Sequence, residues 1–177
     1  VDLCERAGRD IVVAVTERHA DLGVVADSVD LGGLEVRPLR PDPLVVLTAP
    51  SDPLADRDSV SFAEIADRTF VRLSDAAGFA LVTRPNCRLA LPTVDAVCRA
   101  VVAGAGIAIL PSHSVAAHCA TGTLAATALD DRWAARRLVI CHAGEQDLST
   151  AARALRDHLV TYRGGAAGAT APQSSTV

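Results

Sequence analysis

Hydrophobic positions along the chain switch repeatedly between the spacing of an amphipathic helix and the short unbroken run of a buried strand. The clearest predicted helix starts at Val94, because apolar residues recur at helical spacing as far as Val102 and Thr93 can cap it. Other helices are predicted at 11–19, 61–68, 111–119 and from Ser149 onward, and strands at 21–26, 34–39, 44–48, 69–73, 107–110 and 137–141. This alternation predicts an α/β fold with mostly parallel sheets.

Two extended segments are placed to connect separate halves of the molecule. Residues 38–43, PLRPDP, cannot form the interior of a helix, because proline lacks the N–H and restricts the residue before it. With the segment near 136–142, the stretch 38–48 predicts a bridge between two sub-sheets and a cleft between two lobes, where helix N-termini can meet a small anion. Residues 163–177 are rich in Gly, Ala, Ser and Thr and predict a disordered tail.

Composition limits which kinds of partner and which cellular location we expect for this chain. The 177 residues carry a net charge of −4, which argues against this chain gripping a phosphate backbone by itself. Residues 100–129 contain no Asp, Glu, Lys or Arg, but glycines, Pro111 and polar residues interrupt them, so a buried helix–strand–helix is favoured over a membrane span. Residues 1–15 lack a signal-peptide pattern, and the five widely spaced cysteines are typical of reduced thiols, most of them in the core. We expect a cytoplasmic protein with no membrane contact.

Two patterns suggest chemistry that their context does not support. The glycines of AGAGIAILP (103–111) close a helix and enter a strand, whereas a dinucleotide loop follows a strand and opens a helix. The pairs His118–Cys119 and Cys141–His142 suggest metal ligands or a Cys–His nucleophile, but neither has metal-finger spacing. A buried cysteine beside a solvent-facing histidine is the favoured interpretation. We therefore expect no cofactor and no metal.

Small hydroxyl residues at predicted helix starts are better candidates for a binding site. Ser74 follows a predicted strand, and Thr93 precedes the helix that starts at Val94. In a two-lobed α/β protein such positions face the cleft, where a hydroxyl and free backbone N–H groups can bind a carboxylate. The alternative is that each hydroxyl only caps its own helix.

Five stretches of the chain together resemble the effector-binding domain of LysR-type transcriptional regulators. The fourth of them is the most specific, and in order they span nearly the whole chain outside the tail. They are ADLGVV (20–25), LVVLTAPSDPLA (44–55), VSFAEIA (60–66), VAGAGIAILP (102–111) and LSTAARALRDHL (148–159).

This resemblance implies a type 2 periplasmic-binding-protein-like fold with two lobes, a two-strand hinge and a small-molecule effector in the cleft. It implies a first lobe of residues 1–42 and 140–162, without its first strand and helix and with residues 1–8 as its second strand, and a second lobe of residues 43–139. Gly8 takes the position where many relatives carry a cleft serine or threonine. The resemblance also implies a homodimer or tetramer, with DNA contacted only through a helix-turn-helix domain outside this chain.

The leading hypothesis is an effector-sensing regulatory domain, which is not an enzyme and binds a carboxylate inducer through Gly8, Ser74 and Thr93. Two other classes stay open. A solute-binding protein of a transporter shares the fold type. An enzyme on this scaffold, such as a thiol hydrolase using Cys141 or Cys119, would have a thiol that reacts much faster than a buried one.

Overall fold

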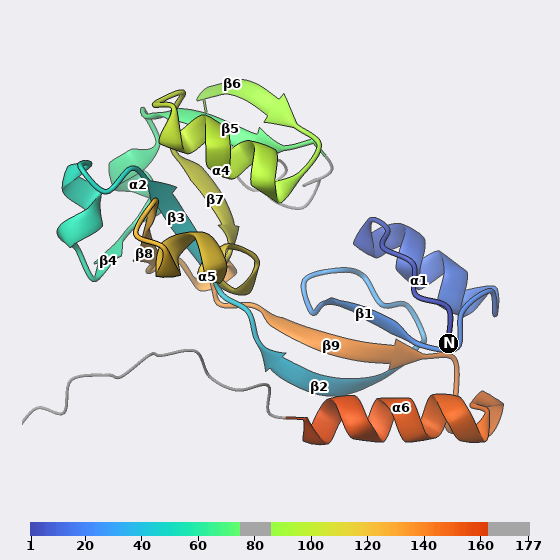
Figure 1. The fold of residues 1–177 in the computed structure, drawn as a ribbon. Coiled ribbons are helices and arrows are strands. Elements are labelled where there is room, and N and C mark those ends of the chain that lie inside the picture. The colour runs from blue at the N-terminus through green and yellow to red at the C-terminus, as the bar shows by residue number, and fades with distance from the viewer. Residues whose placement is uncertain (75–85, 163–177) are drawn as a thin grey trace, which may run out of the picture.

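The fold is taken from a computed structural model, which describes residues 1–74 and 86–162 (Figure 1). One sheet has the order β1-β9-β2, with β1 (Gly23–Ala26), β9 (Arg137–His142) and β2 (Glu35–Pro41). A second sheet has the order β4-β8-β3-β7, and a third pairs β5 with β6. Their strands are β3 (Leu44–Thr48), β4 (Ser59–Val60), β5 (Thr69–Leu73), β6 (Asn86–Leu91), β7 (Ala108–Pro111) and β8 (Ala125–Leu129).

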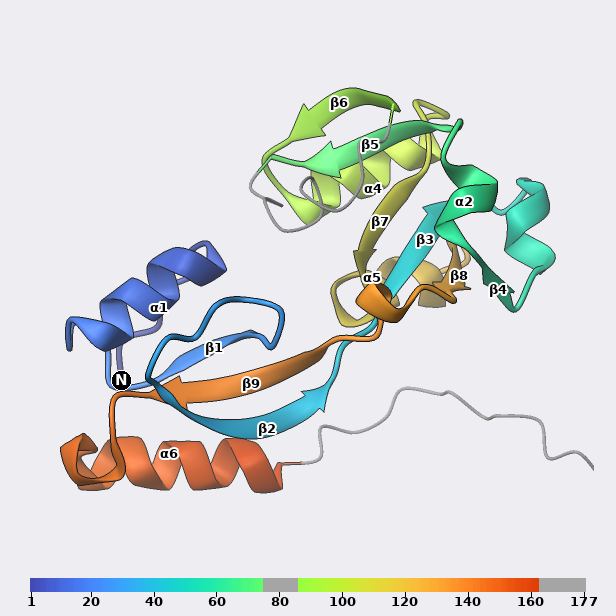
Figure 2. The same cartoon turned by 180° about the vertical axis from the view of Figure 1, so that it is seen from behind.

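These sheets form two lobes that are joined by two chain crossings (Figures 1 and 2). Lobe I, as we use the term, comprises the sheet β1-β9-β2 with α1 (Gly8–Thr16), η3 (Glu145–Asp147) and α6 (Thr150–Thr161). Lobe II comprises the other two sheets with η1 (Pro53–Asp56), α2 (Phe62–Ile65), α4 (Val94–Val102), α5 (Ser112–Ala120) and η2 (Arg132–Ala134). The chain enters lobe II from β2 into β3 and returns from η2 into β9. The expected tail at 163–177 lies outside the described residues.

Local sequence signals set the helix starts as predicted. Thr93 Oγ1 accepts a hydrogen bond from the Ala96 N–H at 3.2 Å, and Ser149 Oγ accepts one from the Ala152 N–H at 3.1 Å. At α2 the Glu64 carboxylate accepts from the Ser61 N–H at 2.9 Å, which is the reciprocal arm of a capping box. These bonds satisfy amides that the first helical turn leaves unpaired.

The core of lobe II lies on both faces of β3. Val45 and Leu47 pack with Val97 and Val101 of α4, while Val46 belongs to a separate cluster on the other face. That second cluster also contains Leu54, Val60, Ile65, Phe70 and Ile107. Because β3 is covered on both faces, its sequence is an unbroken apolar run and not an alternating one.

The predicted predominance of parallel strands is wrong. β9 runs antiparallel to both β1 and β2, and β3 runs antiparallel to both β7 and β8; among the described strands, the parallel pairs are β4–β8 and β5–β6. Alternating strands and helices give parallel neighbours when each helix returns the chain to the same end of one sheet. Here β2 leads toward lobe II and β9 leads back, so the two connecting strands have opposite directions.

Residues 1–7 are not the strand that the family resemblance implies. They form no strand and are exposed, with Val1 103% and Leu3 96% accessible. A strand needs a neighbour for its backbone N–H and C=O groups, and the described residues offer this segment none. The first helix starts at Gly8, three positions earlier than the predicted 11. Among the described helices, none combines the length and the apolar character that a membrane crossing requires.

Candidate functional site

Ser74 and Thr93 come together at one edge of lobe II. β5 and β6 are parallel, with Leu73 opposite Leu91, so both strands leave the sheet at the same end. The Ser74 N–H donates to the Leu91 carbonyl oxygen at 2.8 Å, and Thr93 follows Leu91 by two positions. The two predicted hydroxyl residues therefore lie at the carboxyl ends of adjacent parallel strands, where α/β proteins commonly bind ligands.

The start of α4 adds hydrogen-bond donors to this edge. The first helical bond runs from the Val97 N–H to the Thr93 carbonyl oxygen at 3.1 Å, and the Ala96 N–H is taken by Thr93 Oγ1. The N–H groups of Val94 and Asp95 come before these two in the chain, where a helix has no carbonyl acceptor for them, so they can donate to a ligand. Thr93 caps its helix as the alternative interpretation predicts, but a hydroxyl that accepts one bond still has its own proton to donate.

Arg72 is a third polar residue of this edge, and sequence reasoning did not single it out. Its Nη1 donates to the Ser74 carbonyl oxygen at 3.1 Å and lies 3.3 Å from the Leu73 carbonyl oxygen. The guanidinium therefore places a positive charge beside Ser74. The signal in the sequence is one arginine between apolar residues near the end of a strand, which alone is indistinguishable from a solvated position.

Gly8 lies on lobe I, at the start of α1, and is not brought into contact with the other two. An added Cβ at this position would lie 3.0 Å from Val29 Cγ2, so a larger residue would require Val29 to shift. Figures 1 and 2 show α1 and the β5–β6 pair on the same side of the two strands β2 and β9. Gly8 thus belongs to the other lobe from Ser74 and Thr93.

A partly buried ion pair fixes the point where the chain crosses between the lobes. Arg136 Nη2 donates to Asp42 Oδ2 at 2.8 Å, and Arg136 Nε donates to the Asp42 carbonyl oxygen at 3.0 Å. The Asp42 N–H returns a bond to the Arg136 carbonyl oxygen at 3.1 Å, and the His113 N–H lies 3.4 Å from Asp42 Oδ1. This pair, Asp42–Arg136, which we call the hinge pair, joins both crossings to the first turn of α5. The sequence had predicted only an extended structure for PLRPDP (38–43).

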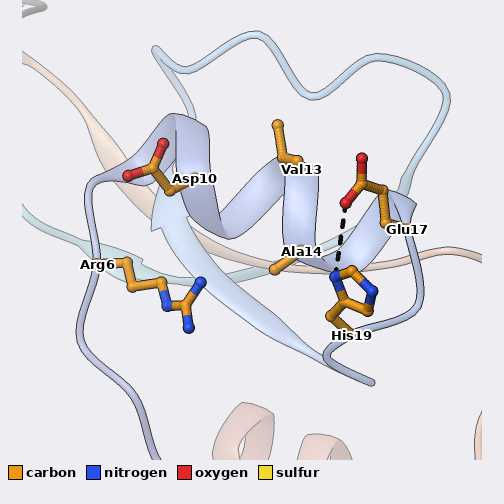
Figure 3. A pocket seen from close by; sticks show the side chains of 6 residues that line it. All are labelled: Arg6, Asp10, Val13, Ala14, Glu17 and His19. Carbon is orange, nitrogen blue, oxygen red and sulfur yellow. Dashed lines mark ion pairs between the residues drawn. The ribbon is translucent and has the colours of Figure 1, made fainter.

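A shallow hollow beside α1 is not the predicted site. Its volume is about 220 Å³, below the roughly 300–1,000 Å³ of typical small-molecule sites. None of the predicted site residues lines it. Figure 3 shows the lining side chains, with Arg6 coming from the segment before the helix and Glu17 paired with His19 at 3.5 Å: Arg6, Asp10, Val13, Ala14, Glu17 and His19.

The cysteines only partly follow the prediction. Cys98 and Cys141 are buried, but Cys4 and Cys87 are exposed and Cys119 is intermediate, so the expectation that most lie in the core is wrong. Burial raises the pKa of the Cys141 and Cys119 thiols, which keeps both protonated at neutral pH. A nucleophilic thiol needs the opposite shift, so neither environment supports a thiol hydrolase.

His142 and Arg156 are both buried, although His142 was expected to face solvent. β9 has covered residues on both faces: Val139 and Cys141 pack with Val15 of α1, while Ile140 and His142 alternate with them and point the other way. Arg156 of α6 pairs with Glu145 and Asp157, which explains how a guanidinium is accommodated there. Burial on both faces of one strand cannot be deduced from that strand alone.

The fold is similar to several solved LysR regulatory domains. The Synechocystis PCC6803 CcmR regulatory domain in complex with 2-PG matches with a TM-score of 0.72 and 23% identity, over 86% of this chain and 78% of that one. The QuiR effector-binding domain in complex with shikimate gives 0.69 and 22%, over 88% and 77%. The C-terminal domain of a probable LysR family regulator from Rhodococcus sp. RHA1 gives 0.69 and 18%, over 88% and 81%. At these identities the likeness establishes the two-lobed periplasmic-binding-protein-like fold.

The sequence match identifies the family independently of the fold. The model of the LysR substrate binding domain matches residues 1–163, which includes both lobes and both crossings between them. The predicted resemblance is confirmed over this range. The chain therefore belongs to the LysR substrate-binding domain family, the effector-sensing part of LysR-type transcriptional regulators.

Proposed function

We propose that this domain binds a small carboxylate effector between its lobes, with Ser74 and Thr93 on lobe II and the Gly8 end of α1 on lobe I. The observation that carries the proposal is that Ser74, Thr93 and the first amides of α4 all lie at one edge of lobe II. A carboxylate accepts hydrogen bonds only, and the Ser74 hydroxyl, the Thr93 hydroxyl and the Val94 N–H all can donate. The positive end of the helix dipole and the Arg72 charge favour an anion at the same place.

Asp95 limits how the anion sits. It lies in the first turn of α4, where its charge would repel a carboxylate, but Arg99 Nη1 pairs with it at 2.9 Å. The ligand is therefore expected on the Ser74 side of the helix start, near Arg72 and away from Asp95. Gly8, which offers no hydroxyl, contributes space and its backbone rather than a side-chain bond.

Effector binding would act by shifting a population between two arrangements of the lobes. A ligand moves such an equilibrium only by its different affinity for the two states. We assign residues 1–42 and 137–162 to lobe I and 43–136 to lobe II, with the hinge pair Asp42–Arg136 at the boundary. The predicted boundary at 139/140 falls inside β9.

Membership of the family is the basis for a proposal about the oligomeric state and the partners of this domain. The domain would form a homodimer or tetramer in the cytoplasm, without enzymatic activity, and DNA would be contacted by a helix-turn-helix domain outside this chain. Relatives solved with 2-PG and with shikimate support a small-molecule effector. None of these matches supports a transporter's solute-binding protein, which is the alternative that the fold type alone leaves open.

Isothermal titration of the chain with a panel of small mono- and dicarboxylates tests the proposal. Thr93→Asp keeps a good helix cap but adds a negative charge, and Ser74→Ala removes one donor, so each should weaken binding about ten-fold or more. Ser114→Ala, at an exposed serine of α5, is the matched control and should leave the affinity unchanged. A carboxylate bound equally well by all of these variants would overturn the assignment.

A further inference from the structure

The last residue of β9 is a buried histidine, His142, and Figures 1 and 2 show this end of the strand pointing away from lobe II. The side chain of His142 is 0% exposed, and neither Nδ1 nor Nε2 has a hydrogen-bond partner among the described residues. Buried polar atoms in native proteins are nearly always satisfied, because an unpaired one loses its contacts with water and gains nothing. The imidazole therefore needs a partner that these residues do not supply.

Two carboxylates face this ring. Glu35 stands directly opposite His142 in the β2–β9 ladder, which puts both side chains on one face of the sheet, with Glu35 Oε2 3.9 Å from Nδ1. Glu145 of η3 brings Oε2 to 4.0 Å from Nε2. One ring nitrogen and one oxygen of each carboxylate all lie within 4.8 Å of one another. Both distances are too long for hydrogen bonds. They end on different ring nitrogens, so a single ion would use one of the two, and the mutual spacing within 4.8 Å is what leaves room for that ion.

We propose that Glu35, His142 and Glu145 bind one Zn²⁺ ion. An imidazole nitrogen and two carboxylate oxygens suit this metal, and a water molecule would complete four-coordination. Ligand atoms around tetrahedral zinc stand roughly 3.4 Å apart, so groups that now lie within 4.8 Å of one another must approach by up to about 1.4 Å. The Glu35 and Glu145 side chains are 52% and 44% exposed and can rotate, whereas β9 holds the imidazole in place.

The surroundings prepare Glu145 for this role. The Arg156 guanidinium donates to Glu145 Oε2 and lowers the pKa of that carboxyl, so it stays ionised as a metal ligand must be. Arg156 is itself nearly buried and pairs with Asp157 at 2.8 Å, which fixes its orientation. A carboxylate has several lone-pair sites, so Glu145 can hold Arg156 and a metal together. Outer partners of this kind orient metal ligands in known sites.

The test is metal titration of the purified, tag-free chain in a Cys4→Ser/Cys87→Ser background, which removes the two exposed thiols. Zn²⁺ binding is followed by calorimetry, and Co²⁺ is used as a coloured substitute. The expected result is one ion per chain, a higher melting temperature, and a change in the ¹⁵N resonances of the His142 ring. Affinity should fall as pH is lowered, because protons compete for the ring nitrogen.

Glu35→Gln is the decisive variant, because this side chain is half exposed and its amide is isosteric, so the fold should survive as judged by circular dichroism. It should weaken Zn²⁺ binding about ten-fold or more. Glu17→Gln is the matched control: Glu17 also lies beside a histidine, His19, but both are exposed, and its replacement should leave the affinity unchanged. Equal affinity in Glu35→Gln, or unchanged His142 resonances on saturation, would overturn the proposal, as would the absence of stoichiometric binding.

Discussion

Replacing Arg136 with alanine should destabilise the domain more than replacement of any exposed arginine. The substitution removes the two side-chain bonds that Arg136 makes to Asp42, at 2.8 and 3.0 Å. Among the described residues, the Asp42 carboxylate then keeps only the His113 N–H, at 3.4 Å, while it remains inside the protein. A buried charge is thereby left almost without compensation.

The size of the effect follows from the burial of the two partners. Removing one member of a buried ion pair typically costs about 3–5 kcal/mol of unfolding free energy. The Asp42 side chain is 4% exposed and the Arg136 side chain 21%, so water can partly reach the pair, and we expect about 3 kcal/mol, the lower end of that range. The double variant Asp42→Ala/Arg136→Ala should fall short of the sum of the single effects by about 2 kcal/mol, because the second change removes the unpaired charge.

Urea unfolding at pH 7, followed by circular dichroism and by fluorescence of the single tryptophan, Trp133, measures these values. Arg99→Ala is the matched control, since Arg99 pairs with Asp95 on the surface of α4 and should contribute only about 0.5 kcal/mol. If Arg136→Ala costs no more than Arg99→Ala, or if the double-variant effect is additive, the hinge pair does not stabilise the crossing as argued.

Three further predictions use other parts of the molecule. Gly23→Ala would place a Cβ 2.6 Å from Ile11 Cγ2 and 2.9 Å from Cys141 Sγ, so it should cost about 1–3 kcal/mol in thermal unfolding. Gly33→Ala, which meets no atom within 4 Å, should cost far less, and equal losses would contradict the crowding. Backbone and side-chain bonds from Ser61, with the Arg57 bond, lower the pKa of Glu64 from 4.5 to about 2. The stability that Glu64 adds over Glu64→Gln should therefore be present above pH 4.5 and decline as pH falls toward 2; a difference independent of pH would refute this. Iodoacetamide at pH 7 should label Cys4 and Cys87 quickly and Cys98 and Cys141 slowly, as mass spectrometry can show, whereas fast labelling of Cys141 would revive a catalytic thiol.

Local features of this fold could be predicted because their causes are local. The caps at Thr93, Ser61 and Ser149 each involve a side chain and a backbone group within three positions, so the sequence alone places the starts of α4, α2 and α6. Hydrophobic spacing likewise placed six strands to within a few residues, β1, β2, β3, β5, β7 and β9, but it did not predict β4, β6 or β8. Ser74 and Thr93 were correctly expected at strand and helix ends, although their shared edge depends on the pairing of β5 with β6.

What sequence reasoning missed depends on contacts between distant segments. The directions of β2 and β9 are set by the two crossings, which local periodicity does not report. Arg136 has the appearance of a solvated arginine until Asp42, 94 positions away, is placed beside it. His142 is the last residue of its strand, a position that is commonly exposed. It is buried because β9 is covered on both faces.

The central place of β9 has a consequence for how the protein emerges from the ribosome. Both β1 and β2 pair with β9, and neither pairs with the other, so the sheet of lobe I has no ladder until residues 137–142 have been synthesised. The sheets of lobe II are complete earlier, by Leu129. Nascent lobe II can thus fold while the two outer strands wait without partners, and exposed strand edges of this kind invite association with other chains. Because of this order of synthesis, lobe I, which contains the amino-terminal residues of the chain, is the last lobe to fold.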